Sequence, residues 1–295
     1  MLNLSILMTI LINGLCTGSL FGLVSAAFSF QFGALKMTNF AHGAFIMLGM
    51  YLFYFSMNIM HNDASIVIPT LLILFFFLGY ILRLTLLRSS DANVQIIVTS
   101  GLAMILESMV LFIAGALPRT LLSGIPPNWK IPIGNSVLVI NQFNVLTFLV
   151  SSLVLAGFAL FLKKTWLGMA IRGVVQQKEA AYLMGIDAGK IVNIGYAISF
   201  IISAIASIMI ALQFPLEPIS GHYYQLMGFL VCLIAGMGNL NGGFFAGLLV
   251  GLISTVVSIL SPKWHDAIIF TLFVILLTFF PNGVFLLKKS MSREV

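Results

Sequence analysis

Residues 223–261 read YYQLMGFLVCLIAGMGNLNGGFFAGLLVGLISTVVSILS, an apolar stretch that contains no charged residue. A cluster of glycine and asparagine at 236–243 interrupts this stretch near its middle, and such a cluster breaks a helix. About 20 apolar residues suffice for a helix to cross the hydrocarbon core of a bilayer. The stretch therefore forms either one membrane span or two shorter ones.

The composition of the whole chain agrees with a membrane environment. Of its 295 residues, 60% are hydrophobic and 7% are charged, whereas an ordinary soluble domain is about 25% charged. The 14 basic and 8 acidic residues cannot cover a soluble protein of this size with a charged surface. We therefore exclude a soluble fold and predict an all-α polytopic membrane protein, with residues 1–295 forming a single transmembrane domain.

Seven further stretches have the length and apolar character of membrane spans. They are residues 6–30, 39–60, 66–87, 92–117, 143–162, 191–213 and 266–287.

The basic residues decide how residues 223–261 cross, because lysine and arginine concentrate in short cytoplasmic loops. If this stretch crosses twice, every basic residue except Arg119, Lys130 and Lys263 lies on the cytoplasmic side. A single crossing would instead place the C-terminal basic residues outside. We predict about 8 to 9 membrane helices, some interrupted or re-entrant, with the N-terminus outside and the C-terminus in the cytoplasm.

Two polar segments are long enough to fold outside the lipid. Residues 118–142 form a predicted extracytoplasmic loop, which four prolines stiffen. Residues 163–190 are rich in Ala, Gln, Lys and Glu, and this composition predicts a helix that lies on the cytoplasmic face.

Small residues recur at four-residue spacing in two of the predicted spans. Small residues at this spacing let helix backbones approach closely in lipid. The candidate packing residues are Gly14, Gly18, Gly22, Gly243, Gly247 and Gly251. The spacing of Asn39 and Gly43 also equals that of Asn239 and Gly243, which indicates an inverted repeat with a substrate pathway at its interrupted spans. The alternative is that glycine is simply common in membrane helices.

The sequence contains no motif that would carry a reaction. It lacks a phosphate-binding loop, a His-Glu-x-x-His zinc motif and a Gly-x-Ser-x-Gly nucleophile. We therefore predict no enzyme, no catalytic residue, no metal site and no cofactor bound by this chain. It also lacks a basic run that could follow a phosphate backbone, so nucleic acid is excluded as a partner.

Polar residues near the helix breaks are the candidates for a substrate pathway. They are Asn39, His42, Gly43, Asn239 and Asn241. The alternative for His42, next to Asn39, is a residue that caps or packs a helix starting inside the protein. The remaining histidines, including His222, lie at predicted outer ends of spans, where they would be solvated.

Glu107 is the acidic residue that lies clearly at membrane depth, inside the span 92–117. A carboxylate there is costly unless it faces a partner, a cavity or water. We predict that it faces the protein interior, with no basic residue at the same depth. Two roles stay open for Glu107: a protonated group that hydrogen-bonds a neighbouring helix, or a charged group that meets the ammonium group of a substrate.

Several motifs in this order resemble the permease subunits of bacterial branched-chain amino-acid ABC importers, a family that also has urea and short-amide members. They are Asn13-Gly14, Gly18-Ser19, Met37-Thr-Asn-Phe-Ala-His-Gly43, Arg88-Ser-Ser90, Leu167-Gly-Met-Ala-Ile-Arg172, Leu183-Met-Gly-Ile-Asp187, Gly236-Met-Gly-Asn-Leu-Asn-Gly242 and Pro281-Asn-Gly283. The resemblance covers nearly the whole chain.

This resemblance implies a multi-pass subunit of the bacterial inner membrane. Its partners would be a second permease, identical or related, two cytoplasmic ATPases that use the ATP, and an extracytoplasmic substrate-binding protein. Residues 163–190 would be the ATPase-coupling segment, because Glu179-Ala-Ala-x-x-x-Gly185 matches the first half of the docking motif of such permeases. The coupling residues would be Arg172, Glu179, Ala180, Ala181, Gly185 and Asp187.

Three features depart from the family pattern. The docking motif lacks its usual Ile-x-Leu-Pro ending. Ala44 follows His-Gly where many members carry an acidic residue, and Glu107 stands where members tend to have glutamine. The alternative function is a stand-alone secondary carrier or channel that uses Glu107 as its proton or ion site.

Overall fold

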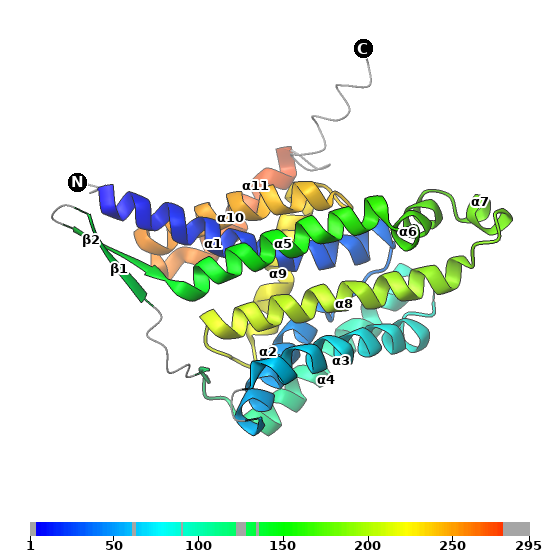
Figure 1. The fold of residues 1–295 in the computed structure, drawn as a ribbon, viewed down its shortest axis with the longest axis horizontal. Coiled ribbons are helices and arrows are strands. Elements are labelled where there is room, and N and C mark those ends of the chain that lie inside the picture. Colours follow the sequence, from blue (N-terminus) through cyan, green and yellow to red (C-terminus); the bar gives the residue numbers. More distant parts are fainter. Residues whose placement is uncertain (1–3, 61–62, 90, 122–127, 134–135, 280–295) are drawn as a thin grey trace, which may run out of the picture.

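A computed structural model describes the chain except residues 1–3, 61–62, 90, 122–127, 134–135 and 280–295 (Figure 1). Within the described residues, eight helices are long and apolar enough to cross a membrane. This confirms the predicted all-α polytopic membrane fold. The structure adds one feature, a two-stranded antiparallel hairpin within the loop 118–142.

The elements follow one another along the chain with short connections. They are α1 (Leu4–Ser29), a π-helical turn (Phe30–Ala34), α2 (His42–Ile59), α3 (Ala64–Thr85), α4 (Ala92–Ala114), β1 (Asn128–Ile133), β2 (Ser136–Asn141), α5 (Gln142–Lys164), α6 (Trp166–Gln176), α7 (Lys178–Leu183), α8 (Ala188–Gln213), α9 (Ser220–Ala235), α10 (Leu240–Leu260), a 3-10 turn (Pro262–Trp264) and α11 (His265–Phe279).

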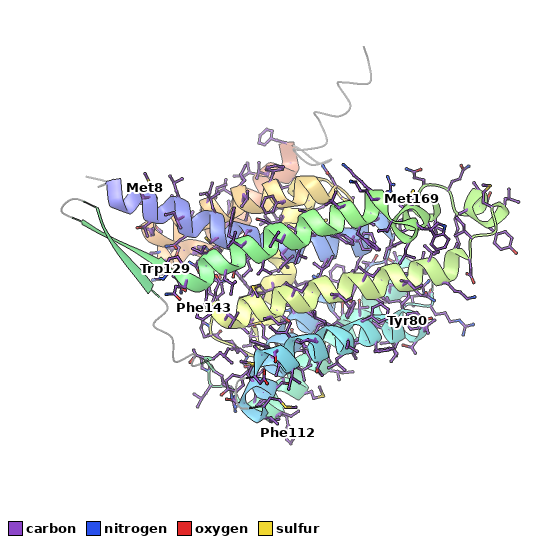
Figure 2. All side chains as sticks on the ribbon, viewed as in Figure 1. Met8, Tyr80, Phe112, Trp129, Phe143 and Met169 are labelled. Atoms are coloured by element: carbon purple, nitrogen blue, oxygen red, sulfur yellow. The ribbon has the colours of Figure 1, made fainter. Side chains whose placement is uncertain are left out.

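The long helices α1, α3, α5, α8 and α10 run along the long axis of the molecule, whereas α9 lies across them (Figure 1). The hairpin β1–β2 is at one end, and the short helices α6 and α7 are at the other. Helices α1 and α8 are mostly buried and form the core. Long apolar side chains project from the periphery, as the labelled Phe112 of α4 does in Figure 2. Lipid is the solvent that suits such a surface.

Helices α1 and α10 make the most extensive helix–helix contact and run antiparallel. A Cβ built on Gly18 would lie 2.6 Å from the Cα of Leu248, and one on Gly251 would lie 2.2 Å from the Cα of Gly18. Gly14, Gly22 and Gly247 lie in the same contact, while a Cβ on Gly243 would meet only Ser25, at 3.9 Å. The backbones approach this closely because these positions lack side chains.

The stretch 223–261 forms two helices, α9 and α10, that are separated at residues 236–239. Gly236 and Gly238 have φ angles of 83° and 82°, which favour glycine. The interruption predicted from the sequence is therefore confirmed. The predicted span 266–287 is described only to Phe279, and the Pro281-Asn-Gly283 motif lies outside the described residues.

The prediction that residues 163–190 form one helix was wrong, whereas their position on the cytoplasmic face stays a prediction. Lys163 and Lys164 end α5, and two short helices, α6 and α7, follow before α8. Gln177 separates the two short helices with extended backbone angles of φ −154° and ψ 93°. Gly185, with a φ of 78°, then turns the chain toward α8.

Candidate functional site

Helix α2 begins inside the protein, and side chains from α4 bind the backbone that leads into it. The Thr38 N–H donates to Oε1 of Gln95 at 2.8 Å, and the Phe40 N–H donates to Oγ1 of Thr99 at 3.0 Å. Gln95 and Thr99 are buried and lie one turn apart on α4. An unpaired backbone group at membrane depth costs several kcal/mol. These two side chains therefore allow the chain to be non-helical at this depth.

Two further acceptors complete the start of α2. The Asn39 Oδ1 accepts a hydrogen bond from the Ala41 N–H at 2.9 Å, which is the geometry of an Asx turn. The Gly43 N–H donates to Oε1 of Gln225 on α9 at 2.7 Å. A Cβ on Gly43 would lie 2.0 Å from the carbonyl oxygen of Gly221, so α2 and α9 touch here. Gly43 is required by this close approach.

Asn39 also belongs to a buried polar chain that joins the segment before α2 to the π-helical turn and to α8. Its Nδ2 donates to Oε1 of Gln31 at 3.2 Å, and Nε2 of Gln31 donates to Oγ of Ser199 on α8 at 2.8 Å. His42 is buried with its ring edge-on to Phe28, 5.5 Å between centroids. In this conformation Asn39 and His42 make the contacts of capping and packing residues. Their role in a substrate pathway stays a prediction.

Glu107 faces His222, the third residue of α9. The distance between its Oε2 and the His222 Nε2 is 3.0 Å. The Glu107 side chain is 18% exposed and the His222 side chain 64%. The expectation that Glu107 has no basic neighbour was wrong, because α9 lies across the spans and brings its first turn beside α4. His222 is largely exposed, as expected for a span end, and it is also the partner of Glu107.

Two of the three departures from the family pattern, Ala44 and Glu107, lie at the same place. A Cβ on Gly221 would lie 3.2 Å from the Cα of Ala44 and 3.3 Å from Oε1 of Glu107. Ala44 on α2, which stands where family members carry an acidic residue, and Glu107 on α4 therefore both border Gly221 on α9. This part of the molecule is where α2, α4 and α9 converge.

The break between α9 and α10 contacts the end of α1. Asn239 caps α10 through a hydrogen bond from the Gly242 N–H to its Oδ1 at 3.0 Å, and its Nδ2 donates to the Ala235 carbonyl at 3.3 Å. The Gly238 N–H donates to Oγ of Ser29 at 3.1 Å. Asn241 belongs to the first turn of α10, but its side chain lies outside the described part of the structure.

The two breaks share α1 as a neighbour. Asn39 binds Gln31, and Gly238 binds Ser29, two residues away on the same segment. A Cβ on Gly33 would lie 2.1 Å from the backbone nitrogen of Gly238. The structure thus brings residues 36–43 and 236–239 against the same few turns of the chain.

The predicted coupling residues lie on both sides of the tip formed by Tyr182, Leu183 and Met184. Ala181 is buried, whereas Glu179, Arg172 and Gly185 are exposed and Ala180 is half-buried. Asp187 caps α8 by accepting the Lys190 N–H at 3.1 Å, and this hydrogen bond holds the pKa of Asp187 below its usual value. The apolar side chains of Tyr182, Leu183 and Met184 are all more than 70% exposed.

Sequence reasoning missed the side chains that satisfy the backbone at the start of α2. They are Gln95, Thr99 and Gln225. A usable signal was present, since each is an amide or hydroxyl side chain inside an otherwise apolar span, and Gln95 and Thr99 share one helix face.

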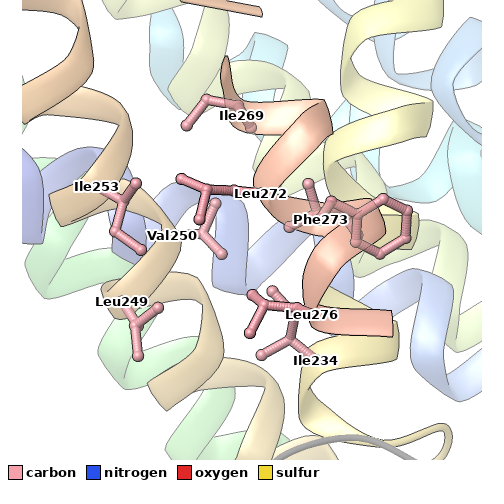
Figure 3. Close-up of a pocket in the computed structure, with 9 residues that line it drawn as sticks. Ile234, Leu249, Val250, Ile253, Ile269, Leu272, Phe273 and Leu276 are labelled. Atoms are coloured by element: carbon pink, nitrogen blue, oxygen red, sulfur yellow. The ribbon is translucent and has the colours of Figure 1, made fainter. Parts of the chain in front are cut away.

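Neither the cavity shown in Figure 3 nor the acidic, histidine and cysteine side chains of the described residues form a ligand or metal site. Figure 3 shows an apolar seam where α9, α10 and α11 meet, between residues such as Ile234, Val250 and Leu276, with a cavity of about 20 Å³. This volume holds about one water molecule and no ligand. Among the described residues, no three His, Cys, Asp or Glu side chains gather as a metal site requires.

Comparison with known proteins gives a consistent set of relatives. A permease protein of the high-affinity branched-chain amino acid transport system of Pseudomonas aeruginosa, BraD, is 24% identical over 93% of this chain and 94% of its own length. The corresponding protein of Escherichia coli, LivH, is 23% identical over 92% of this chain and 93% of its own length. A probable LivH of Methanocaldococcus jannaschii is 24% identical over 76% of this chain and 72% of its own length. No solved structure matches the chain.

A family model gives the assignment over the membrane domain. It matches residues 10–277, which include both helix breaks, the pair Glu107–His222 and the segment α6–α7. The chain therefore belongs to the family described as the permease component of the branched-chain amino acid transport system.

Proposed function

We propose that this chain is the membrane permease subunit of an ABC importer that moves branched-chain or other small amino acids into the cell. The family match over residues 10–277 carries this proposal, together with the names of the relatives. If the importer does not transport amino acids, its substrates would be urea or short amides. The energy would come from ATP hydrolysis on separate subunits, and this chain would perform no enzymatic step.

The tip formed by Tyr182, Leu183 and Met184 would be the ATPase contact. These side chains are exposed. Helix α7 lies at the end of the molecule opposite the hairpin (Figure 1). Exposed apolar patches of this kind mark protein–protein contacts. Nearby Lys163, Lys164, Arg172 and Lys178 support a cytoplasmic position for this end. The chain would then lie in the inner membrane with its N-terminus outside.

The hairpin end would face the extracytoplasmic binding protein. Arg119 and Leu216 exchange backbone hydrogen bonds of 3.0 and 2.7 Å, so the loops after α4 and α8 form one surface at that end. A second permease, identical or related, would complete the membrane assembly.

The pathway in this proposal passes the convergence of α2, α4 and α9. Glu107 and His222 supply polar groups there, and His222 is largely exposed on the surface of the single subunit. The pairing with His222 supports the role in which Glu107 bonds a neighbouring helix. It also supports the alternative function, a proton-coupled carrier, because a Glu–His pair can exchange a proton.

Co-purification tests the assembly. We expect the affinity-tagged chain, extracted in mild detergent, to bring down a second permease and an ATPase. The Leu183→Asp variant should lose the ATPase and keep the second permease, because the change is confined to the exposed tip. The matched control is Asn58→Asp, which adds the same charge at an exposed position of α2, outside the coupling segment. Equal ATPase recovery from Leu183→Asp and Asn58→Asp would contradict the docking role.

A cysteine at Gln176 tests the orientation. It should react in intact cells with a membrane-permeant thiol reagent and resist an impermeant one. Labelling by the impermeant reagent would reverse the proposed topology.

A further inference from the structure

A cavity of about 430 Å³ lies between α1, α9, α10 and the start of α11. This volume is within the roughly 300–1,000 Å³ of small-molecule sites. Asn13 in its wall accepts a hydrogen bond at 3.0 Å from Asn144, the third residue of α5, which places this wall near the hairpin end. None of the residues that line the cavity belongs to the proposed pathway.

The wall changes from polar to aromatic with distance from the hairpin end. Asn13, Thr17 and Phe21 lie at four-residue spacing on one face of α1. Helix α1 begins at the hairpin end, so Asn13 is nearest to that end and Phe21 is farthest from it (Figure 1). The Phe21 ring meets the Tyr223 ring edge to face with 6.4 Å between centroids, and the Tyr224 ring centroid is 5.4 Å from that of Tyr223. The aromatic end suits the apolar part of a ligand.

Several polar groups of the wall are free to bind a ligand. Asn13 uses its Oδ1 for Asn144, and its Nδ2 makes no hydrogen bond to the described residues. Within the same part of the chain, the hydroxyl groups of Thr17, Tyr224 and Ser258 also have no partner. A ligand can therefore be bound from α1, α9 and α10 without breaking an existing hydrogen bond.

The wall carries no unpaired charge. Its described residues include no Asp, Glu, Lys or Arg, and His265 is the one among them that can become cationic. The His265 Nδ1 is 2.7 Å from Oδ1 of Asp266, and its Nε2 is 2.8 Å from Oγ of Ser254, so both ring nitrogens already have partners. Asp266 neutralises the ring when it is protonated, and the neutral ring carries no charge. The cavity therefore offers no free charge in either state of His265.

This absence of free charge selects uncharged ligands. In the described wall a carboxylate would lack a cationic partner, and an ammonium group would lack a carboxylate. Burying a charged group without such a partner is unfavourable. An amino acid carries both charges and does not fit. A carboxamide fits, because its N–H donors and its carbonyl acceptor match the free hydroxyl and amide groups of the wall.

We propose that this cavity binds a small uncharged molecule with a carboxamide-like end and an apolar end. The polar end lies at Asn13, Thr17 and Ser258, and the apolar end lies against Phe21 and Tyr223. The inference goes beyond the proposed function and does not rest on it, because the site does not fit an amino-acid cargo. The ligand coincides with the cargo only if the importer carries short amides.

Thiol protection tests the site on the full-length protein, with its co-purifying subunits, in lipid nanodiscs. The buried Cys16 and Cys232 are replaced by alanine to remove background. Ile259→Cys introduces a reporter in the wall, and Leu260→Cys introduces one at the next residue, which is exposed and does not line the cavity. The rate of reaction with the uncharged reagent methyl methanethiosulfonate is measured at neutral pH with isovaleramide, isovalerate, isoamylamine or L-leucine.

We expect isovaleramide at millimolar concentration to slow the Ile259→Cys reaction at least threefold. Isovalerate, isoamylamine and L-leucine have the same branched carbon chain but carry charge, and they should leave the rate unchanged. The Leu260→Cys rate should respond to none of the four compounds, which excludes a general effect on the membrane or the reagent.

Two valine variants test the polar end of the site. Thr17→Val removes a free hydroxyl group and should raise the isovaleramide concentration for half protection at least threefold. Thr255→Val is the matched control, because Thr255 lines the same cavity but donates its hydroxyl to the Gly251 carbonyl at 2.9 Å. The control should leave the concentration for half protection unchanged.

Four results would overturn the proposal. An unreactive Ile259→Cys means that lipid fills the cavity. Absent protection by isovaleramide removes the ligand, and equal protection by a charged compound removes the selectivity. Equal half-protection concentrations for Thr17→Val and Thr255→Val remove the assigned polar end. The proposed function would survive each of these results, because ATP-dependent leucine uptake tests it separately.

Discussion

Gly251→Ala should separate α1 from α10 and destabilise the membrane domain. The added Cβ would lie 2.2 Å from the Cα of Gly18 and 2.6 Å from the carbonyl oxygen of Gly14. Carbon atoms pack at about 3.5–4.0 Å, so the helices must part locally by roughly 1.3 Å or more. All three close contacts are with backbone atoms of α1, which cannot move aside as a flexible side chain would.

The expected cost follows from two opposing effects. Overpacking of a tight interface costs about 1–3 kcal/mol. Alanine is also a better helix former than glycine by about 0.8–1 kcal/mol, which offsets part of that cost. Gly157→Ala on α5 is the matched control, since nothing lies within 4 Å of its Cβ. The control should gain stability, and the two variants should differ by roughly 2 kcal/mol.

Thermal unfolding in detergent, followed by size-exclusion chromatography, measures this difference. We expect the Tm of Gly251→Ala to fall below that of Gly157→Ala by several degrees. Equal Tm values for the two variants would refute the close packing of α1 on α10.

Three further changes have distinct expected outcomes. Glu107→Gln retains neutral hydrogen bonding and removes the charge, so transport measured from pH 5 to 8 should change if the charge acts on substrate; an unchanged rate and substrate range would leave Glu107 a structural role. Gln95→Leu leaves a buried backbone N–H unpaired, which costs about 1–3 kcal/mol, so folded yield should fall, whereas Asn93→Leu at an exposed position of the same helix should not lower it. Asp187 has a pKa below its usual value because it accepts the Lys190 N–H; its ionised form therefore stabilises α8 at neutral pH and loses this effect as the pH falls through the lowered pKa. The Tm advantage of the wild type over Asp187→Ala should accordingly shrink between pH 7 and pH 3.

The membrane fold could be predicted because each span carries its own signal. Apolar length identifies the spans, and the glycine cluster at 236–243 identifies the break between α9 and α10. Gly14, Gly18, Gly247 and Gly251 could be recognised as packing positions because their four-residue spacing places them on one helix face.

The side chains that pair with one another at the candidate site could not be predicted, because these pairings depend on how spans far apart in the sequence cross. The pairing of Glu107 with His222 requires the first turn of α9 to lie beside α4, and no local pattern encodes that placement. The acceptors Gln95 and Gln225 likewise lie 57 and 182 residues from the backbone groups they bind. The short helices α6 and α7 were taken as one, since only the backbone at Gln177 separates them.

In the proposed function, this chain is the membrane path of an ATP-driven amino-acid importer. The most direct measurement is uptake of radiolabelled leucine into proteoliposomes that contain the purified complex and its binding protein. We predict uptake that requires ATP on the side of the ATPases, persists when ionophores abolish proton and sodium gradients, and is lost when Leu183→Asp releases the ATPase. Uptake that proceeds without ATP and collapses with the ionophores would contradict the claim and identify a secondary carrier.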